Sequence, residues 1–147
     1  MRATFYPELA DQLLDGARRG LRACGVRDED VALYDVPGCF ELPLAASRII
    51  AGGDTVDALV ALGVVIRGET PHFEYVAGEC ARGIMAVQLA TGVPIGFGVL
   101  TTDTLDQAEK RADPARGDKG FGAALAAAAT LCVPGEPQAT ELGIRFP

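Results

Sequence analysis

Residues 62–75 read LGVVIRGETPHFEY and mark an abrupt change from a buried strand to a helix. The segment from Ala58 to Val65 is almost entirely apolar, which is typical of a strand buried on both faces of a parallel sheet. Gly68 then allows a tight turn, Thr70 is suited to cap a helix, and Pro71 fits the first helical position. The stretch therefore predicts a helix that begins beside the end of a central strand.

Such a junction is suited to binding an anionic ligand. Open α/β sheets bind ligands at the carboxyl ends of their strands, and the unpaired N–H groups of a helix start attract groups such as phosphate. His72, the only histidine of the chain, falls in the first turn of this helix. A lone histidine is more often just a partly exposed polar side chain, but an imidazole at this position could also transfer protons.

The composition limits the class of protein. A chain of 147 residues with 49% hydrophobic and 22% charged residues fits one compact domain. It has no run of about 18 apolar residues, and Met1–Thr4 lacks the apolar core of a signal peptide, so we expect a soluble cytoplasmic protein without membrane partners. The net charge of −7 argues against nucleic acid as a partner and leaves room only for a small basic pocket.

The cysteines do not predict a metal site. Cys24, Cys39, Cys80 and Cys132 contain no C-x-x-C pair, and there is no second histidine to complete a set of zinc ligands. Reduced, mostly buried thiols are the favoured interpretation. Cys39 alone lies within a candidate site, where a packing role is favoured over that of a nucleophile.

The remaining segments alternate between strand and helix patterns. Strands are predicted at about 31–36, 58–65 and 93–100, and helices at about 7–24, 40–51, 71–90, 104–111 and 119–132. This order predicts an α/β fold, a three-layer α/β/α sandwich with a mostly parallel, flavodoxin-like sheet. We expect one domain over residues 1–133, followed by an irregular C-terminal tail over 134–147.

The segments that follow three predicted strands contain more polar and ionisable side chains than packing requires. They read VPGCFE at 36–41, RGETPH at 67–72 and LTTD at 100–103. Because the carboxyl ends of parallel strands meet at one edge of a sheet, we expect these segments to form a shared rim.

With these segments the sequence resembles the lumazine synthase (6,7-dimethyl-8-ribityllumazine synthase) family of riboflavin biosynthesis. The matching motifs are VPG-x-FE-x-P at 36–43, LG-x-VIRGET-x-HF-x-YV at 62–76 and FGVLTTDT at 97–104. The middle motif is too long and too particular for a chance match. The resemblance extends from Phe5 to about Leu131.

The resemblance implies a transferase that needs no metal or organic cofactor. Members of this family condense 5-amino-6-(D-ribitylamino)uracil with 3,4-dihydroxy-2-butanone 4-phosphate and release phosphate and water. It also implies a homopentamer, or an assembly of pentamers, with active sites at subunit interfaces. An alternative is a non-catalytic protein that holds a flavin or lumazine on the same fold. A generic flavodoxin-like binding domain is a third possibility, supported only by the topology.

The resemblance also implies a set of site residues, with catalysis assigned to His72. Phe5 would stack on the pyrimidine, and Phe97 would reach the site from a neighbouring subunit. The implied substrate-binding residues are Phe5, Cys39, Phe40, Glu41, Val64, Val65, Ile66, Phe97 and Lys119. The implied phosphate-binding residues are Gly68, Glu69, Thr70 and Arg111.

Each of these roles has an ordinary alternative. Phe5 could be a core aromatic and Phe97 a buried strand residue. Glu41 could be an acid favoured by a helix dipole. Arg111 could be a solvated residue at a helix end, and Lys119 a loop charge.

The start of the chain departs from the family. Relatives have a β-strand before the stacking aromatic, whereas only Met1–Thr4 precede Phe5, so the first strand is missing or truncated. Its absence would leave backbone groups and apolar neighbours of the sheet uncovered. A misplaced start of the sequence is the simplest explanation. Replacement pairing by Thr140–Phe146, from the same or another subunit, is the second.

Overall fold

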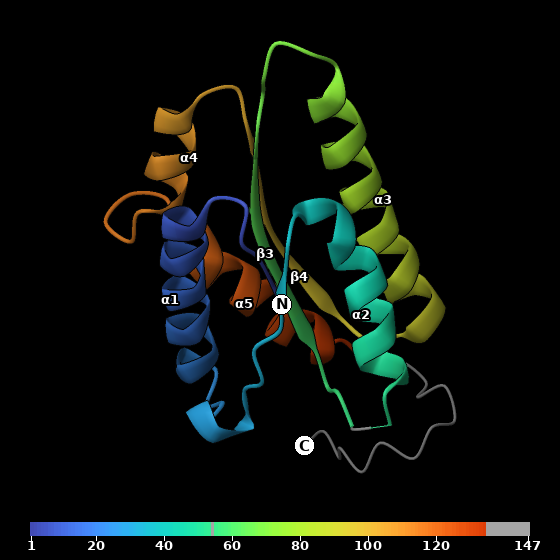
Figure 1. The fold of residues 1–147 in the computed structure, drawn as a ribbon. Helices are drawn as coiled ribbons and strands as arrows, with labels where there is room; N and C mark the ends of the chain where they lie inside the picture. Colours follow the sequence, from blue (N-terminus) through green and yellow to red (C-terminus); the bar gives the residue numbers. More distant parts are fainter. Residues whose placement is uncertain (54, 135–147) are drawn as a thin grey trace.

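A computed structural model of the chain describes residues 1–53 and 55–134, so nearly all of the predicted tail lies outside the described residues. Two layers of helices enclose a sheet (Figure 1). The elements, in chain order, are β1 (Arg2–Ala3), α1 (Pro7–Ala23), the short 3₁₀ helix η1 (Asp28–Asp30), β2 (Asp35–Val36), the 3₁₀ helix η2 (Cys39–Glu41), α2 (Leu42–Ala51), β3 (Leu59–Ile66), α3 (His72–Thr91), β4 (Ile95–Thr102), α4 (Leu105–Ala112) and α5 (Lys119–Leu131). Within the described ranges, no helix combines the length and apolar character needed to cross a membrane.

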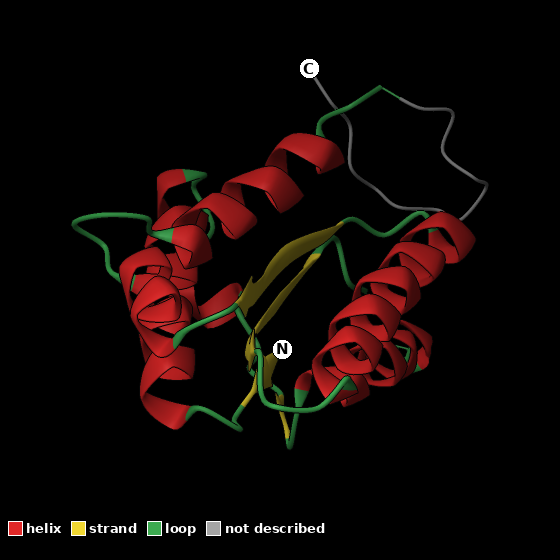
Figure 2. Cartoon of the chain, turned by 90° about the horizontal axis from the view of Figure 1, so that it is seen from above, coloured by secondary structure: helices red, strands yellow, loops and turns green. Residues whose placement is uncertain are grey.

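The sheet is parallel, with the strand order β2-β1-β3-β4. Its longest pairing joins β3 to β4 along their whole length, from Leu59 opposite Ile95 to Ile66 opposite Thr102. Helices α1, α4 and α5 cover one face and α2 and α3 cover the other, as the view from above shows (Figure 2). The predicted three-layer α/β/α sandwich is confirmed.

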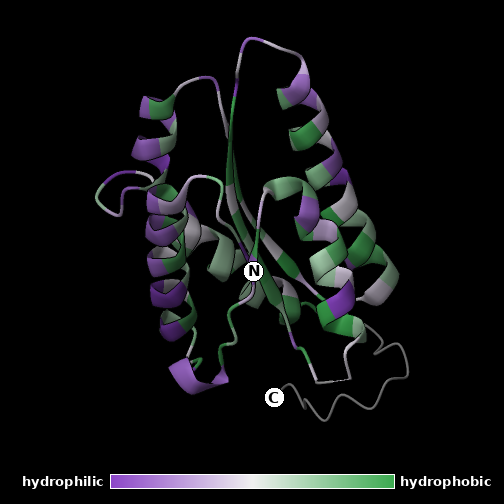
Figure 3. Cartoon of the chain, viewed as in Figure 1, coloured by the Kyte–Doolittle hydropathy of each residue, from purple (hydrophilic) through white to green (hydrophobic). Residues whose placement is uncertain are grey.

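Strand β3 separates two hydrophobic cores and belongs to both. Ala61 and Val65 pack with Ile84 on the side of α2 and α3, whereas Leu62 and Val64 pack with the residues of α1. Side chains on both faces of β3 are therefore buried, which explains why its sequence is a continuous apolar run rather than an alternating one. Figure 3 shows mostly hydrophobic strands at the centre, hydrophilic stretches along α1, and a mixture of hydrophobic and hydrophilic residues along α2 and α3.

Element boundaries follow the predicted turn chemistry with small shifts. Gly25 and Gly92 follow α1 and α3 with φ of +86° and +72°, which glycine adopts without strain, so the predicted ends of both helices are confirmed. The start of α3 was predicted one residue too early. Pro71 is its N-cap, with φ −63°, and the side chain of Thr70 makes no capping hydrogen bond.

The second strand is shorter than its sequence predicts. A strand was predicted over 31–36, but β2 contains only Asp35 and Val36. Pairing needs a neighbouring strand, and β1 supplies only Arg2 and Ala3 opposite these two residues. The ladder ends where the N–H of Arg2 donates to the carbonyl of Tyr34 at 2.8 Å.

Strand β1 lies in the interior of the sheet, between β2 and β3. The amino group of Met1 donates to the carbonyl of Val60 at 2.9 Å, and the carbonyl of Met1 accepts from the N–H of Leu62 at 3.0 Å. Burial lowers the pKa of this amino group from 8.0 to about 6; Asp35 opposes the shift and Arg2 adds to it. In a chain that begins at Met1, an amino group therefore occupies a place in the sheet where an interior strand would have a peptide N–H.

The stability of a chain that carries a free amino group on Met1 is expected to rise between pH 6 and pH 8. The unfolded amine, with a pKa of 8.0, keeps most of its proton until the pH approaches 8, whereas the folded amine, with a pKa of about 6, releases its proton from pH 6 upward. Because the unfolded state binds more protons, the free energy of unfolding increases with pH, by about 2 kcal/mol from this group. Urea unfolding at pH 6, 7 and 8 measures the slope. A protein with an acetylated amino terminus should lose most of this slope. Equal slopes for the acetylated and unacetylated proteins would contradict the lowered pKa of the Met1 amino group.

Candidate active site

The carboxyl ends of the strands lie at one edge of the sheet, but not at one level. Arg2 of β1 is opposite Leu62, so β1 ends while β3 continues to Ile66. In a parallel ladder, alternate residues direct both backbone groups to the same neighbour. Val60 and Leu62 bond toward β1, so the backbone groups of Ile66 point to the same side, beyond the end of β1. A planar ligand could form hydrogen bonds with this part of β3.

The three residues predicted to hold a uracil edge differ in what they offer. The carbonyl oxygen of Val64 already accepts a hydrogen bond from the thiol of Cys39, with 3.7 Å between oxygen and sulfur. Because successive residues of β3 direct their backbone groups to opposite neighbours, the backbone groups of Val65 point toward β4, where Val65 pairs with Thr101. Ile66 is the least buried of the three residues.

Two aromatic side chains and a carboxylate are exposed near the ends of β1 and β2. Phe5 follows β1 and is 72% exposed, with its ring edge-on to Tyr6 at 5.1 Å between centroids. Phe40 in η2 is 56% exposed, and Glu41 beside it is also exposed. The alternative interpretation of Phe5 as a core residue is wrong. Exposed aromatic rings of this kind are suited to stacking on a planar ligand.

Cys39 lies in the core. Its residue is 3% exposed, and burial, with a smaller contribution from Cys80, raises the pKa of its thiol to about 12. A thiol of this kind stays protonated and is a poor nucleophile. The structure thus favours the packing interpretation of this side chain.

The turn between β3 and α3 is exposed from Arg67 to His72. Gly68 does not have a positive φ, and a Cβ added to it would meet nothing within 4 Å, so this turn does not require glycine. Glu69 and Thr70, both exposed, complete the segment predicted to meet a phosphate. His72 is the first residue of α3 and is exposed, so its imidazole is accessible from solvent.

Arg67 connects three elements at this edge and was not among the predicted site residues. Its guanidinium donates to Asp103 after β4 at 2.7 Å and to Glu74 in the first turn of α3 at 2.5 Å, and it lies 4.3 Å from the ring centroid of Phe73. These partners raise the pKa of Arg67, Glu74 most strongly. The arginine therefore fixes the first turn of α3 relative to β4. The signal in the sequence was a strand-end arginine with an acid seven residues later.

A second group of predicted residues lies around β4. A groove of about 420 Å³ is lined by Phe97, Arg111 and Lys119, together with small residues of α5 such as Gly122. Phe97 is 42% exposed, which excludes the buried alternative. The guanidinium of Arg111 contacts the carbonyl of Gln107 at 3.2 Å, and its residue is exposed.

His72 and the groove at β4 lie on opposite faces of the sheet. Arg111 and Lys119 lie on α4 and α5, on one face of the sheet, whereas His72 begins α3 on the other (Figure 1). His72, Phe5 and Phe40 do not line the groove at β4. The structure thus gathers Phe97, Arg111 and Lys119 at one groove and leaves the other predicted side chains outside it.

Neither set resembles a metal centre. Across residues 1–53 and 55–134, no three side chains of His, Cys, Asp or Glu gather closely enough to hold a metal ion. The chemistry available at the strand ends is an exposed imidazole, a carboxylate, two aromatic rings and free backbone groups. The groove at β4 adds a guanidinium and an ammonium group.

Comparison with known proteins identifies the family. A family described as 6,7-dimethyl-8-ribityllumazine synthase matches residues 1–134. A protein of that name from Syntrophus aciditrophicus (strain SB) is 50% identical over 123 residues, which cover 84% of this chain and 79% of the relative. Another of the same name, from Desulfatibacillum aliphaticivorans, is 46% identical over 125 residues, covering 85% and 80%. The exposed rim at the ends of β1, β2 and β3 and these matches lead to one conclusion: the chain belongs to the 6,7-dimethyl-8-ribityllumazine synthase family.

Proposed function

We propose that the chain synthesises 6,7-dimethyl-8-ribityllumazine from 5-amino-6-(D-ribitylamino)uracil and 3,4-dihydroxy-2-butanone 4-phosphate, as a transferase of riboflavin biosynthesis. The observation that carries the proposal is the exposed rim where β3 extends beyond β1. There Phe5 offers a stacking surface, Ile66 offers free backbone groups, and His72 stands at the start of α3. These are the groups that a planar pyrimidine and a proton-transfer reaction need.

The proposed mechanism moves protons at one end of the bound pyrimidine. The 5-amino group attacks the ketone, and loss of water gives an imine. Elimination then releases phosphate and leaves an enol that tautomerises to a carbonyl. The ribitylamino nitrogen attacks this carbonyl, and loss of a second water closes the ring. His72 accepts and donates the protons of these steps. Glu41 accepts hydrogen bonds from the ribityl hydroxyls, because a carboxylate has several lone pairs available. Phe40 packs against the same chain.

The phosphate of the second substrate binds at the turn before α3. Gly68, Glu69 and Thr70 are exposed there, and the N–H groups at the start of a helix favour an anion. Arg111 adds a guanidinium, whose planar pair of donors fits a phosphate, and Lys119 adds a second positive charge.

The complete site forms between two subunits of a ring, in a homopentamer or an assembly of pentamers. The separation of the two sets in one chain supports this arrangement, since Arg111 and Lys119 line a groove that does not include His72. A head-to-tail contact brings the groove of one copy against the rim of the next, and such contacts close into rings. The four free cysteines, two of them exposed, suit the reducing cytoplasm that we propose as its location.

One experiment tests both the reaction and the shared site. Purified protein mixed with the two substrates is expected to produce the absorbance and fluorescence of lumazine. The variants His72→Ala and Arg111→Ala should each lose most of this activity. When their subunits are exchanged at a ratio of one to one, about a quarter of the sites combine an intact His72 with an intact Arg111. The mixture should therefore recover about a quarter of the normal rate.

The controls separate the two parts of the proposal. Exchange of two differently tagged His72→Ala preparations should recover nothing. If the mixture is no more active than its components, the site is not shared in this way. If the unmodified protein binds the product but forms none, the enzymatic proposal fails and a ligand-holding protein is the correct description.

A further inference from the structure

Arg19 of α1 forms a bidentate ion pair with Asp118, the residue before α5. Its Nη1 and Nη2 atoms donate to the two carboxylate oxygens of Asp118 at 2.8 and 2.9 Å. The side chain of Asp118 is 20% exposed, which makes it the least exposed paired carboxylate in the described part of the chain. A bidentate pair of this burial holds its two elements together more firmly than an exposed ion pair does.

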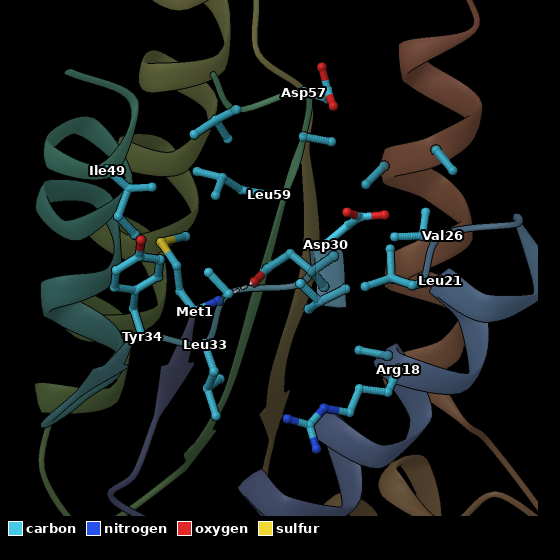
Figure 4. Close-up of a pocket in the computed structure, with 18 of the residues that line it drawn as sticks. Met1, Arg18, Leu21, Val26, Asp30, Leu33, Tyr34, Ile49, Asp57 and Leu59 are labelled. Carbon is cyan, nitrogen blue, oxygen red and sulfur yellow. Dashed lines mark hydrogen bonds between the residues drawn. The ribbon is translucent and has the colours of Figure 1, made fainter. Parts of the chain in front are cut away.

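The backbone of α1 is shaped to receive this carboxylate. Gly16, one turn before Arg19, leaves the room, because a Cβ there would lie 2.6 Å from Oδ1 of Asp118. Arg19 also lies 5.9 Å from the ring centroid of Phe121 in α5. Its neighbour Arg18 instead lines a cavity of about 600 Å³ at the edge of the sheet where β3 begins (Figure 4). Of these two arginines, Arg19 is therefore the one that contacts α5.

Asp118 has an unusual backbone conformation. Its φ is +41° and its ψ is +49°, and it is the only residue other than glycine with a positive φ among those that the structure describes. Aspartate adopts this left-handed region less readily than glycine, and such a conformation persists only where surrounding contacts fix it. The ion pair with Arg19 is a contact of that kind.

The conformation of Asp118 affects where α5 begins relative to α4. The carbonyl of Asp118 accepts a hydrogen bond from the N–H of Gly122, in the first turn of α5, at 3.1 Å. The preceding Gly117 packs against α4, where an added Cβ would lie 2.7 Å from the Cα of Arg111. Lys119 follows Asp118 directly, as the first residue of α5. Asp118 thus connects the two basic residues that line the groove at β4.

We propose that Arg19 is a positioning residue for Lys119: by holding Asp118, it sets the place of the Lys119 ammonium group relative to Arg111. This role rests on the proposed function, in which these two cations bind the phosphate of the substrate. Arg19 does not line the groove, so it acts through Asp118 and not by contact with the ligand. A displacement of about 1 Å in a substrate-positioning group has a large effect on the reaction.

The variant Arg19→Gln tests the proposal, and Arg22→Gln is its matched control. Arg22 lies in the same helix and also makes a bidentate pair, with both bonds to Asp28 at 2.8 Å, but neither residue lines the groove. Arg19→Gln is expected to raise the Kd for inorganic phosphate and the KM for the phosphate substrate about five- to tenfold, with kcat changed less than about twofold. Arg22→Gln should change none of these values. The Tm of each variant shows whether it is folded.

Amide hydrogen exchange at Gly122 reports the conformation of Asp118 independently of catalysis. Because this N–H bonds to the carbonyl of Asp118, its exchange should become at least about tenfold faster in Arg19→Gln and stay unchanged in Arg22→Gln. Arg19→Lys keeps the charge but loses the planar fork, so its phosphate Kd should lie between those of Arg19→Gln and the unmodified protein. In Asp118→Gly protein, Arg19→Gln should raise the phosphate Kd no further, since the partner carboxylate is already absent.

The outcomes separate the role of Arg19 from the proposed function. If the unmodified protein forms no lumazine, the proposed function fails, and the phosphate titration together with the exchange at Gly122 still decides the role of Arg19. If lumazine forms but Arg19→Gln weakens phosphate binding no more than Arg22→Gln does, the positioning role is overturned. It is also overturned if exchange at Gly122 becomes faster while the phosphate Kd stays the same, because the pair then stabilises α5 without positioning Lys119. Additive effects of Arg19→Gln and Asp118→Gly would mean that Arg19 acts by another route, and they overturn the proposal as well.

Discussion

Replacing His72 by alanine is expected to lower turnover by about 10- to 1000-fold and to leave the protein folded. His72 is exposed at the first position of α3, and it is not part of either hydrophobic core. Its loss therefore removes an imidazole without opening a cavity. The proposed reaction includes the loss of water, the elimination of phosphate and a ring closure, and each of these steps moves a proton.

Steady-state formation of lumazine measures this effect, and the Tm reports whether the fold is intact. Complete loss of activity is not expected, because holding two substrates together accelerates their reaction independently. Added imidazole should restore part of the rate in His72→Ala, since it can enter an exposed site. Turnover that is unchanged, or lost only together with the fold, would contradict the assignment.

The central strand was predictable because its environment is uniform. Every second side chain of β3 enters one core and the others enter the second, so burial on both faces gave a signal in a single sequence. The capping of α4 was predictable for a similar local reason. The side chain of Thr104 accepts from the N–H of Gln107 at 3.2 Å, a contact between near neighbours in the chain.

The length of β2 was not predictable, because it depends on a distant partner. Val31 to Val36 has the composition of a strand, yet pairing stops at Asp35, where the partner from the start of the chain runs out. Local propensity cannot report the absence of a neighbour.

The candidate site was predicted as a set of residues and not as an arrangement. Family motifs indicated Phe97 and Arg111, but sequence position alone could not show that they line a groove separate from His72. Arg67 was missed because its partners, Asp103 and Glu74, come from different elements. Relations of this kind follow from packing in three dimensions.

Replacing Gly120 by alanine is expected to destabilise the protein by about 3 kcal/mol or more. Gly120 lies at the start of α5, against α1, and a Cβ at this position would lie 2.0 Å from the carbonyl oxygen of Leu13. Leu13 is fully buried in α1, so that carbonyl belongs to backbone that cannot rotate away. The two helices would have to separate. Since Lys119 is the preceding residue, the groove at β4 would be displaced as well.

Gly122 provides the matched control in the same helix. A Cβ added there meets nothing within 4 Å, so Gly122→Ala should stabilise the protein by about 0.5–1 kcal/mol through helix propensity alone. Urea unfolding of both variants measures the difference, which isolates the steric cost of the contact with Leu13 because the chemical change is identical. If the two substitutions gave equal stabilities, α1 and α5 would not approach as closely as the structure shows. A large loss at Gly120 alone would show that the packing of α5, which begins at Lys119, depends on backbone contact with α1.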